Sequence, residues 1–181
     1  MARRKAPKPG VLLAFIVGIT VGIGAQRSGS VDELLNLASM QTTIELTTEE
    51  KEQGFVVVDR VIDGDTVDVI YQGGVERIRM LCINTPEKGK AWYGEATDSL
   101  EELCASGKVR LAFEEPGKPS RGKYGRLLAY LFDEDGRNVN LEQVKRGWSH
   151  FYDDFGPGRF PDDFEQAEKS AKKAKLGIWQ D

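Results

Sequence analysis

The chain has few of the residues that build nucleophile and transition-metal sites: its 181 residues include one histidine and two cysteines. A single histidine, His150, excludes Ser-His-Asp triads, paired-histidine metal sites and enzymes that work with two histidines. Cys82 and Cys104 have no second cysteine or histidine at zinc-ligand spacing, which excludes a zinc site. The two thiols could form a disulfide in an exported protein, or could serve as separate small core residues.

The chain also lacks a surplus of positive charge. Lys and Arg number 25 against 29 Asp and Glu, which gives a net charge of -4. A protein that holds nucleic acid by neutralising phosphates normally has a basic surface, so this charge argues mildly against tight, non-specific binding. It does not argue against turnover, because an enzyme needs positive charge only where the phosphate sits, and a divalent cation can supply part of it.

One long apolar run is present, near the N-terminus. Residues 11–25 are uncharged and follow a basic cluster between Arg3 and Lys8, the layout of a membrane-targeting segment. At a helical rise of about 1.5 Å per residue the run is shorter than the roughly 30 Å hydrocarbon core. It fits a cleaved signal peptide or a short retained anchor better than a buried helix. We therefore predict export, to the periplasm, the cell exterior or the membrane surface, with residues 1–25 contacting the membrane or the export machinery.

The remaining chain divides into a polar linker, residues 26–53, and one globular domain, residues 54–181. The domain begins with two predicted strands, 55–62 and 66–71, joined by the turn Asp63-Gly64-Asp65. A second turn, Gln72-Gly73-Gly74, leads into a third strand that ends near residue 83. Residues 109–113 and 127–132 are the fourth and fifth strands.

Helical patterns fall between and after these strands. Apolar spacing predicts a helix over 93–106, ended by Gly107. Asn140 is the expected N-cap of a second helix, with Gln143 at the capping-box position. Pro161 opens a third helix that is expected to end at Gly177. The predicted buried face of this helix is Phe164, Ala167, Ala171 and Ala174.

Five strands with a helix between the third and fourth is the arrangement of an OB-type β-barrel. The predicted fold class is therefore α+β, a mainly β, five-stranded OB-fold barrel with about three helices. Because this fold serves many functions, the function has to be argued from the site.

Three polar clusters each stand at the end of a predicted strand. They are Asp63-Gly64-Asp65-Thr66, the stretch from Arg79 to Asn84-Thr85-Pro86-Glu87, and Lys123-Tyr124-Gly125-Arg126. Carboxylate and amide oxygens suit a hard cation such as Ca²⁺, and arginines suit bidentate contact with a phosphate. Each cluster alone has an ordinary explanation as a turn or a solvated surface. Together they indicate a site for phosphate chemistry.

These clusters lie within longer motifs that resemble a known family. The segments Val-Ile-Asp-Gly-Asp-Thr-Val, Ile-Arg-Met-Leu-Cys-Ile-Asn-Thr-Pro-Glu and Lys-Tyr-Gly-Arg-Leu-Leu-Ala-Tyr are similar to those of the staphylococcal nuclease (thermonuclease) family, over about residues 55–152. Three motifs in this order are highly specific. The resemblance implies a nuclease that cleaves DNA and RNA with little sequence preference, breaks the bond to the 5′ oxygen and leaves 3′-phosphate ends. We expect the protein to be a monomer.

The resemblance also implies a calcium site. Asp65, the side chain of Asn84 and the backbone carbonyl of Thr85 would bind Ca²⁺, with Asp63 and Glu87 close by. Glu87 would be the general base, or would orient the attacking water.

By the same resemblance, Arg79 and Arg126 would hold the scissile phosphate. Lys123 and Tyr124 would contact a neighbouring phosphate. Tyr152 is a further candidate for substrate contact, by stacking on a base, although an aromatic near the chain end could instead pack on the barrel.

The chain departs from the best-known members at two places. Asn84 stands where they have an aspartate, which keeps an oxygen ligand but removes a charge and should weaken Ca²⁺ binding. Residues 88–92 form a shorter loop, which would alter substrate access. The acidic composition and Asn84 leave a second hypothesis open, a catalytically weak barrel that binds nucleic acid or protein. A third hypothesis, an envelope interaction protein on a tether, leaves the motifs unexplained.

Overall fold

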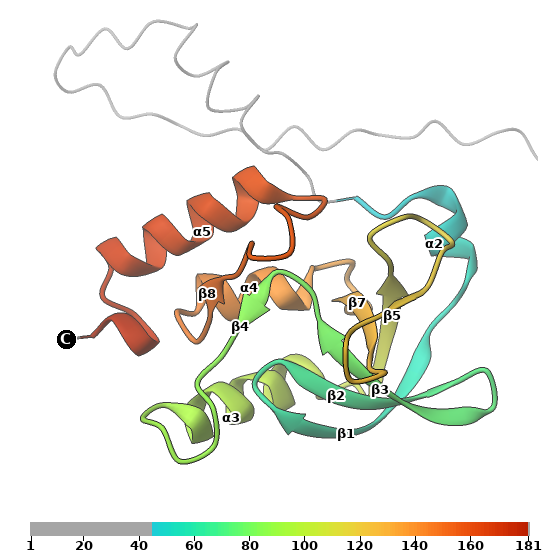
Figure 1. The fold of residues 1–181 in the computed structure, drawn as a ribbon, viewed down its shortest axis with the longest axis horizontal. Helices are drawn as coiled ribbons and strands as arrows, with labels where there is room; N and C mark the ends of the chain where they lie inside the picture. The colour runs from blue at the N-terminus through green and yellow to red at the C-terminus, as the bar shows by residue number, and fades with distance from the viewer. Residues whose placement is uncertain (1–44, 181) are drawn as a thin grey trace, which may run out of the picture. The chain divides into compact units, whose positions relative to one another are not determined.

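In the computed structural model, which describes residues 45–180, the alternating sequence after Phe55 produces a three-stranded antiparallel meander (Figure 1). Its strands are β1 (Val56–Asp63), β2 (Thr66–Tyr71) and β3 (Gly74–Met80). Gln72 and Gly73 join β2 to β3 with φ angles of 49° and 83°. Two positive φ angles are what a two-residue type I′ hairpin turn requires.

Two later strands close the meander into a barrel. β5 (Lys108–Ala112) pairs antiparallel with β1, and β7 (Leu127–Phe132) pairs antiparallel with β5 and parallel with β3. The ring therefore runs β1-β2-β3-β7-β5 and back to β1, which is the OB order, and the predicted fold class is confirmed. The two-residue strand β6 (Ser120–Arg121) pairs with β7 at the edge of the sheet.

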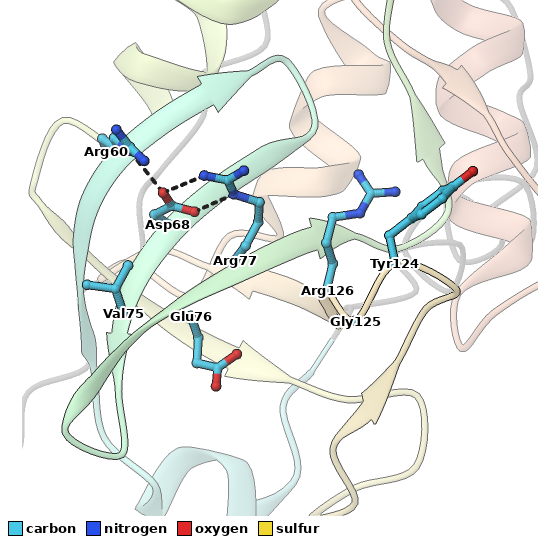
Figure 2. Close-up of a pocket in the computed structure, with 8 residues that line it drawn as sticks. All are labelled: Arg60, Asp68, Val75, Glu76, Arg77, Tyr124, Gly125 and Arg126. Atoms are coloured by element: carbon cyan, nitrogen blue, oxygen red, sulfur yellow. Dashed lines mark hydrogen bonds and ion pairs between the residues drawn. The ribbon is translucent and has the colours of Figure 1, made fainter.

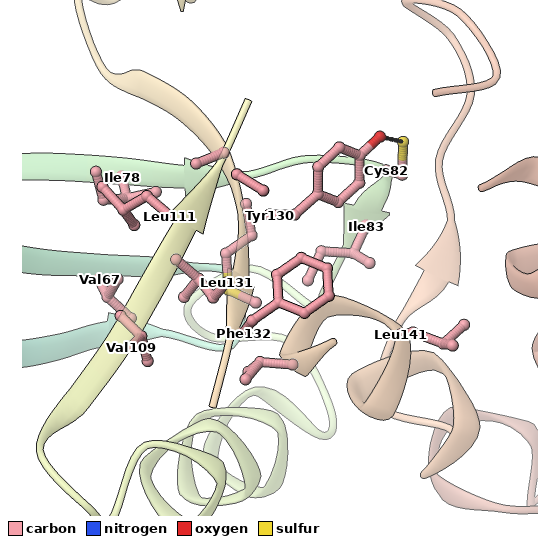
Figure 3. Packing of buried hydrophobic residues seen from close by; sticks show 14 of the residues in the cluster. Val67, Ile78, Cys82, Ile83, Val109, Leu111, Tyr130, Leu131, Phe132 and Leu141 are labelled. Atoms are coloured by element: carbon pink, nitrogen blue, oxygen red, sulfur yellow. Dashed lines mark hydrogen bonds between the residues drawn. The ribbon is translucent and has the colours of Figure 1, made fainter. Parts of the chain in front are cut away.

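The inward-facing side chains of the strands fill the barrel (Figure 3). Val67 of β2, Ile78 of β3, Val109 and Leu111 of β5 and Leu131 of β7 are all buried there. Because successive side chains of a strand point to opposite faces, the residues between these core positions face outward. The candidate site lies on that outer face.

Three longer helices pack around the barrel in the described part of the chain: α3 (Tyr93–Leu103), α4 (Val139–Lys145) and α5 (Pro161–Lys173). α3 packs on β1, and α4 contacts α3, α5 and β7 (Figure 1). α5 buries the predicted Phe164, Ala167 and Ala171, but it ends at Lys173. Ala174 is therefore exposed, which corrects the predicted buried face. Gly177 begins a short 3₁₀ helix, η1 (Gly177–Trp179), rather than stopping α5.

The prediction that Asn140 caps α4 is wrong. The N-cap is Asn138, whose side chain accepts a hydrogen bond from the backbone of Leu141 at 3.1 Å. Asn140 is buried inside the helix, where its amide accepts from the backbone of Leu131 (3.0 Å) and donates to the carbonyl of Leu81 (2.9 Å). Asn140 thereby ties α4 to β7 and to the chain that follows β3.

The folded part of the chain begins before the predicted boundary at residue 54. A helix, α2 (Thr48–Glu52), occupies the end of the predicted linker and starts with a capping box between Thr47 and Glu50. Leu46 and Glu50 are both buried. The end of the polar segment is thus part of the domain.

A buried ion pair attaches α2 to the segment just before α5. Arg159 Nη1 lies 2.5 Å from Glu50 Oε1 and also donates to the carbonyl of Phe113 at 2.9 Å. Burial by itself would raise the pKa of Glu50, but the hydrogen bonds from Arg159 and Thr47 outweigh it and hold that pKa below its usual range. The pair is therefore charged at neutral pH.

The predicted targeting segment, residues 1–25, lies outside the described residues. Across residues 45–180, no helix is both long and apolar enough to cross a membrane. Cys82 and Cys104 are buried and free, so each is a core residue, the second of the two alternatives left open by the sequence.

We expect Glu50→Gln to lower the free energy of unfolding by about 3 kcal/mol, because the Arg159 guanidinium would stay buried without its counter-charge. Urea unfolding followed by tryptophan fluorescence measures this. Glu165→Gln, which removes a partner from the exposed pair with Lys169, is the control and should change stability by less than about 0.5 kcal/mol. A small effect in both variants would contradict the structural role assigned to α2.

Candidate active site

The outer face of β1–β3 carries charged and polar residues in rows that cross the strands. In the register, Thr66 of β2 lies opposite both Asp63 of β1 and Arg79 of β3. Residues up to 16 positions apart in the sequence thus become neighbours in one row. The turn between β1 and β2 places Asp65 at the end of this row.

Asp65 is the residue on which the site is built. Its buried carboxylate accepts hydrogen bonds from the backbone N–H (2.9 Å) and hydroxyl (3.0 Å) of Thr85 through Oδ2. Its Oδ1 accepts from the hydroxyl of Thr66 at 3.1 Å and lies 3.2 Å from Arg79 Nε. A buried carboxylate is tolerated only when it is hydrogen-bonded in this way. These bonds therefore fix its position.

Arg79 links Asp65 to Asn84. Its Nη2 donates to the amide oxygen of Asn84 at 3.2 Å, and its Nη1 donates to the carbonyl of Met80 at 2.6 Å. The side-chain oxygens of Asp65 and Asn84 consequently converge on one cationic group. The guanidinium is itself mostly shielded, with 15% of the Arg79 side chain exposed.

Asn84 is held in place by the C-terminal part of the chain. It lies in the short strand β4 (Ile83–Asn84), which pairs antiparallel with β8 (His150–Phe151). Its backbone N–H donates to Ser149 Oγ at 2.9 Å. No local pattern in the sequence indicates this support, because Ser149 is 65 residues away.

The turn that carries Asp65 is packed tightly against α3 and α4. A Cβ on Gly64 would lie 2.8 Å from Thr85 Oγ1 and 2.9 Å from Ala96 Cβ. Gln143 Nε2 donates to the carbonyls of Gly64 (2.8 Å) and Ala96 (2.9 Å), while its Oε1 accepts from Ser99 Oγ at 2.7 Å. Gln143 therefore fastens the turn to both helices and has no part in a capping box, which corrects its predicted role.

The carboxylates beside the turn favour a cation. Burial and the charge of Asp65 raise the pKa of Asp63 above its ordinary range, since two nearby negative charges repel each other. No group of three or more His, Cys, Asp or Glu residues that could hold a metal occurs in residues 45–180. The predicted ligands are instead the Asp65 carboxylate, the Asn84 amide and the Thr85 carbonyl, with the Asp63 carboxylate close by. This set consists of oxygen atoms only, which fits a hard cation such as Ca²⁺.

Arg126, Tyr124 and Lys123 form a second group, on the loop before β7. Both cationic side chains lie over the Tyr124 ring, with Lys123 Nζ 5.6 Å and Arg126 Cζ 5.7 Å from its centroid. The parallel pairing of Ile78 with Leu127 brings Arg126 alongside β3. There Arg126 and Tyr124 line an open pocket (Figure 2).

Glu87 and Tyr152 are two further predicted site residues, and their side chains share no hydrogen bond with Asp65, Asn84 or Arg79. Glu87 is exposed, and its side chain makes no hydrogen bond or ion pair with any described residue. The pKa of Tyr152 is raised, chiefly by the neighbouring Asp154 carboxylate, while the charge of Arg79 acts in the opposite direction. The structure thus brings Asp63, Asp65, Asn84, Thr85 and Arg79 together and leaves Glu87 outside their hydrogen-bond network.

Comparison with known proteins finds nucleases. A family described as Staphylococcal nuclease homologue matches residues 77–181. The SPbeta prophage-derived endonuclease YokF of Bacillus subtilis is 40% identical over 136 residues, covering 71% of this chain and 45% of that protein. Endonuclease YncB of the same organism is 40% identical over 131 residues (68% and 61%), and a thermonuclease of Staphylococcus intermedius is 35% identical over 131 residues (68% and 75%). The chain spans less than two thirds of either Bacillus relative.

We expect Gly64→Ala to destabilise the domain by about 2 kcal/mol, because the added methyl would overlap Thr85 and Ala96 in a packed interior. Gly94→Ala is the matched control: no atom lies within 4 Å of a Cβ at this position in α3, and the change should be neutral or stabilise by up to about 1 kcal/mol. Urea unfolding of both variants tests the packing, which would be contradicted by equal stabilities.

Proposed function

The chain belongs to the staphylococcal nuclease family, and on that premise we propose that it is a Ca²⁺-dependent endonuclease that hydrolyses phosphodiester bonds in DNA and RNA. The observation that carries the proposal is the convergence of Asp65 and Asn84 oxygens on the Arg79 guanidinium. Oxygen ligands for a cation and a donor for a phosphate are thus within one cluster. Hydrolysis of a phosphodiester requires both.

Asp65, Asn84 and the carbonyl of Thr85 would hold the Ca²⁺, with Asp63 close by. The elevated pKa of Asp63 supports this assignment, because a cation would relieve the repulsion between the two carboxylates. Bound Ca²⁺ would neutralise phosphate charge and lower the pKa of a coordinated water.

The arginines and Glu87 would act directly on the substrate. Arg79, oriented by Asp65, Asn84 and Met80, would donate to phosphate oxygens whose negative charge grows in the transition state. Arg126 would supply a second guanidinium, with Lys123 and Tyr124 beside it. Glu87 would accept the proton of the attacking water, and its lack of an ion-pair partner among the described residues leaves its carboxylate available. Displacement of the 5′ oxygen would then leave a 3′-phosphate.

A second candidate function is binding of nucleic acid or protein without efficient cleavage. Two observations favour it: the net charge of -4 and the uncharged amide of Asn84 at a ligand position. Cleavage assays separate it from the nuclease proposal.

On sequence grounds alone, we also propose that the protein acts outside the cytoplasm, because residues 1–25 have the layout of a targeting segment. We further propose that it acts as a monomer.

We expect the full-length protein to cleave single-stranded DNA and RNA with Ca²⁺ and to lose this activity with a chelator. Glu87→Gln should lower kcat at least about 100-fold, because general-base catalysis contributes this much or more. Glu95→Gln, at another exposed glutamate, is the control and should retain full activity. Gel assays with end-group analysis measure both rate and product. Binding without cleavage in the presence of Ca²⁺ would support the second candidate, and undiminished activity of Glu87→Gln would contradict its assigned role.

Asn84→Asp should bind Ca²⁺ several-fold more tightly than the natural chain, because ligand charge raises calcium affinity. Calorimetric titration of the full-length protein measures the change. Asn138→Asp adds the same charge at the cap of α4, where aspartate caps as well as asparagine, and should leave Ca²⁺ affinity unaltered. Equal or weaker binding by Asn84→Asp would overturn the assignment of residue 84 as a ligand.

A further inference from the structure

A second row of charged residues crosses β1–β3 beside the first. Asp68 of β2 lies opposite both Arg60 of β1 and Arg77 of β3. This arginine row (Arg60, Asp68 and Arg77) is two residues along β2 and β3 from Thr66 and Arg79. Two residues of a strand span about 7 Å. The arginine row therefore runs parallel to the row of Asp63, Thr66 and Arg79, the catalytic row, on the same face of the sheet.

Asp68 holds the two arginines of this row in place. Arg77 forms a bidentate pair with it, through Nε–Oδ1 (2.8 Å) and Nη2–Oδ2 (3.0 Å), and Arg60 Nε donates to Oδ2 at 2.9 Å. The hydrogen bonds from Arg77, aided by the one from Arg60, hold the pKa of the buried Asp68 below its usual range. Two guanidinium groups share one carboxylate, so the row retains one positive charge.

The three arginines around the pocket keep N–H donors that have no acceptor among residues 45–180. Neither Nη of Arg60 nor Nη1 of Arg77 donates a hydrogen bond to a described residue, and the Arg126 guanidinium makes none. All three side chains line one open pocket of about 510 Å³, together with Tyr124 (Figure 2). In an acidic domain, arginines normally find carboxylates, so unpaired donors converging on a pocket point to an anionic ligand.

The other charge at the pocket does not cancel this excess. Glu76 also lines it, but both of its oxygens accept from Arg121 at 2.9 Å, and this hydrogen bonding holds the pKa of Glu76 below its usual range. Of the two carboxylates that line the pocket, only Asp68 therefore offsets the charge of its three arginines. Val75 and Tyr124 add apolar and aromatic surface at the pocket wall, the combination found where single-stranded nucleic acid lies in a groove.

We propose that this pocket binds a phosphodiester of the nucleic-acid strand that flanks the scissile bond, through Arg60 and Arg77. The proposal rests on the nuclease function, which places the scissile phosphate at Arg79 and Arg126, and Arg126 lines the pocket. The spacing of the two rows is similar to that of successive phosphates along an extended strand, so one strand can engage both. The open shape of the pocket suits a polymer that runs across it better than an enclosed small molecule.

The consequence is a preference for substrates longer than a dinucleotide. In the full-length protein, Arg60→Gln/Arg77→Gln should raise KM about tenfold for an oligonucleotide that reaches both rows, because charge-assisted hydrogen bonds to phosphate are lost. Its kcat should stay unchanged, and so should kcat/KM for a dinucleotide that reaches only the catalytic row. An equal loss on both substrates would overturn the proposal.

The control is Arg137→Gln/Arg146→Gln, which removes the same charge outside the pocket. It is closely matched, because Arg137 Nε pairs with the buried Asp133 (2.7 Å) as Arg77 pairs with Asp68. The control should leave KM for the long substrate unchanged; a tenfold rise there would assign the effect to net charge and refute the subsite. Arg60→Gln alone keeps the bidentate Arg77–Asp68 pair and should shift KM in the same direction if the double variant does not fold.

A binding measurement separates this proposal from the nuclease proposal itself. Fluorescence anisotropy with labelled single-stranded DNA or RNA, in chelator, reports binding whether or not the chain cleaves. With Arg60→Gln/Arg77→Gln, the slope of log affinity against log salt concentration should become shallower by about 0.7 for the lost phosphate contact. DNA and RNA should respond alike, since the phosphate is common to both. An unchanged slope would refute the subsite, whereas absent cleavage by the natural chain would refute only the nuclease function.

Discussion

The hydrogen bonds between Asp65 and Thr85 are the constraint on which the site depends. They join the β1–β2 turn to the segment after β3, two parts of the chain 20 residues apart. A carboxylate that is removed from water needs such partners, because an unpaired buried charge is strongly unfavourable. With the carboxylate fixed, Arg79 and Asn84 have defined positions, and the same oxygen that orients the arginine can serve a cation. The same hydrogen bonds therefore stabilise the turn and hold the side chains of the site in position.

Closure of the barrel positions the other group of site residues, which lies on the loop before β7. The parallel pairing of β3 with β7 is made by residues that are far apart in sequence, and it sets Arg126 and Tyr124 beside the outer face of the meander. A meander alone would present one guanidinium-bearing face with no opposing wall. The closed ring turns that face into one side of a pocket.

Much of this architecture could be predicted from local patterns. Alternation of apolar residues indicated the strands, and the place of the helix between the third and fourth strands indicated the barrel. Burial decided the rest. Asn138 and Asn140 are equally good helix caps in isolation, and only packing against β7 selects between them. Arg60 is a similar case: by simple alternation it would face away from Asp63, but an irregularity in β1 between Val61 and Asp63 brings both to the outer face.

Gln143 makes the site sensitive to changes at distant positions in the sequence. Its one side-chain amide bonds to the Asp65 turn and to Ala96 and Ser99 of α3. Only glycine fits at position 64, because Thr85 and Ala96 leave no space for a side chain. These positions cannot vary independently: a larger residue at one requires a smaller residue or a new hydrogen-bond partner at another. Amino-acid replacements at these positions should therefore accumulate in pairs during evolution. A substitution transferred from one relative to another should be tolerated only when the compensating substitution is transferred with it.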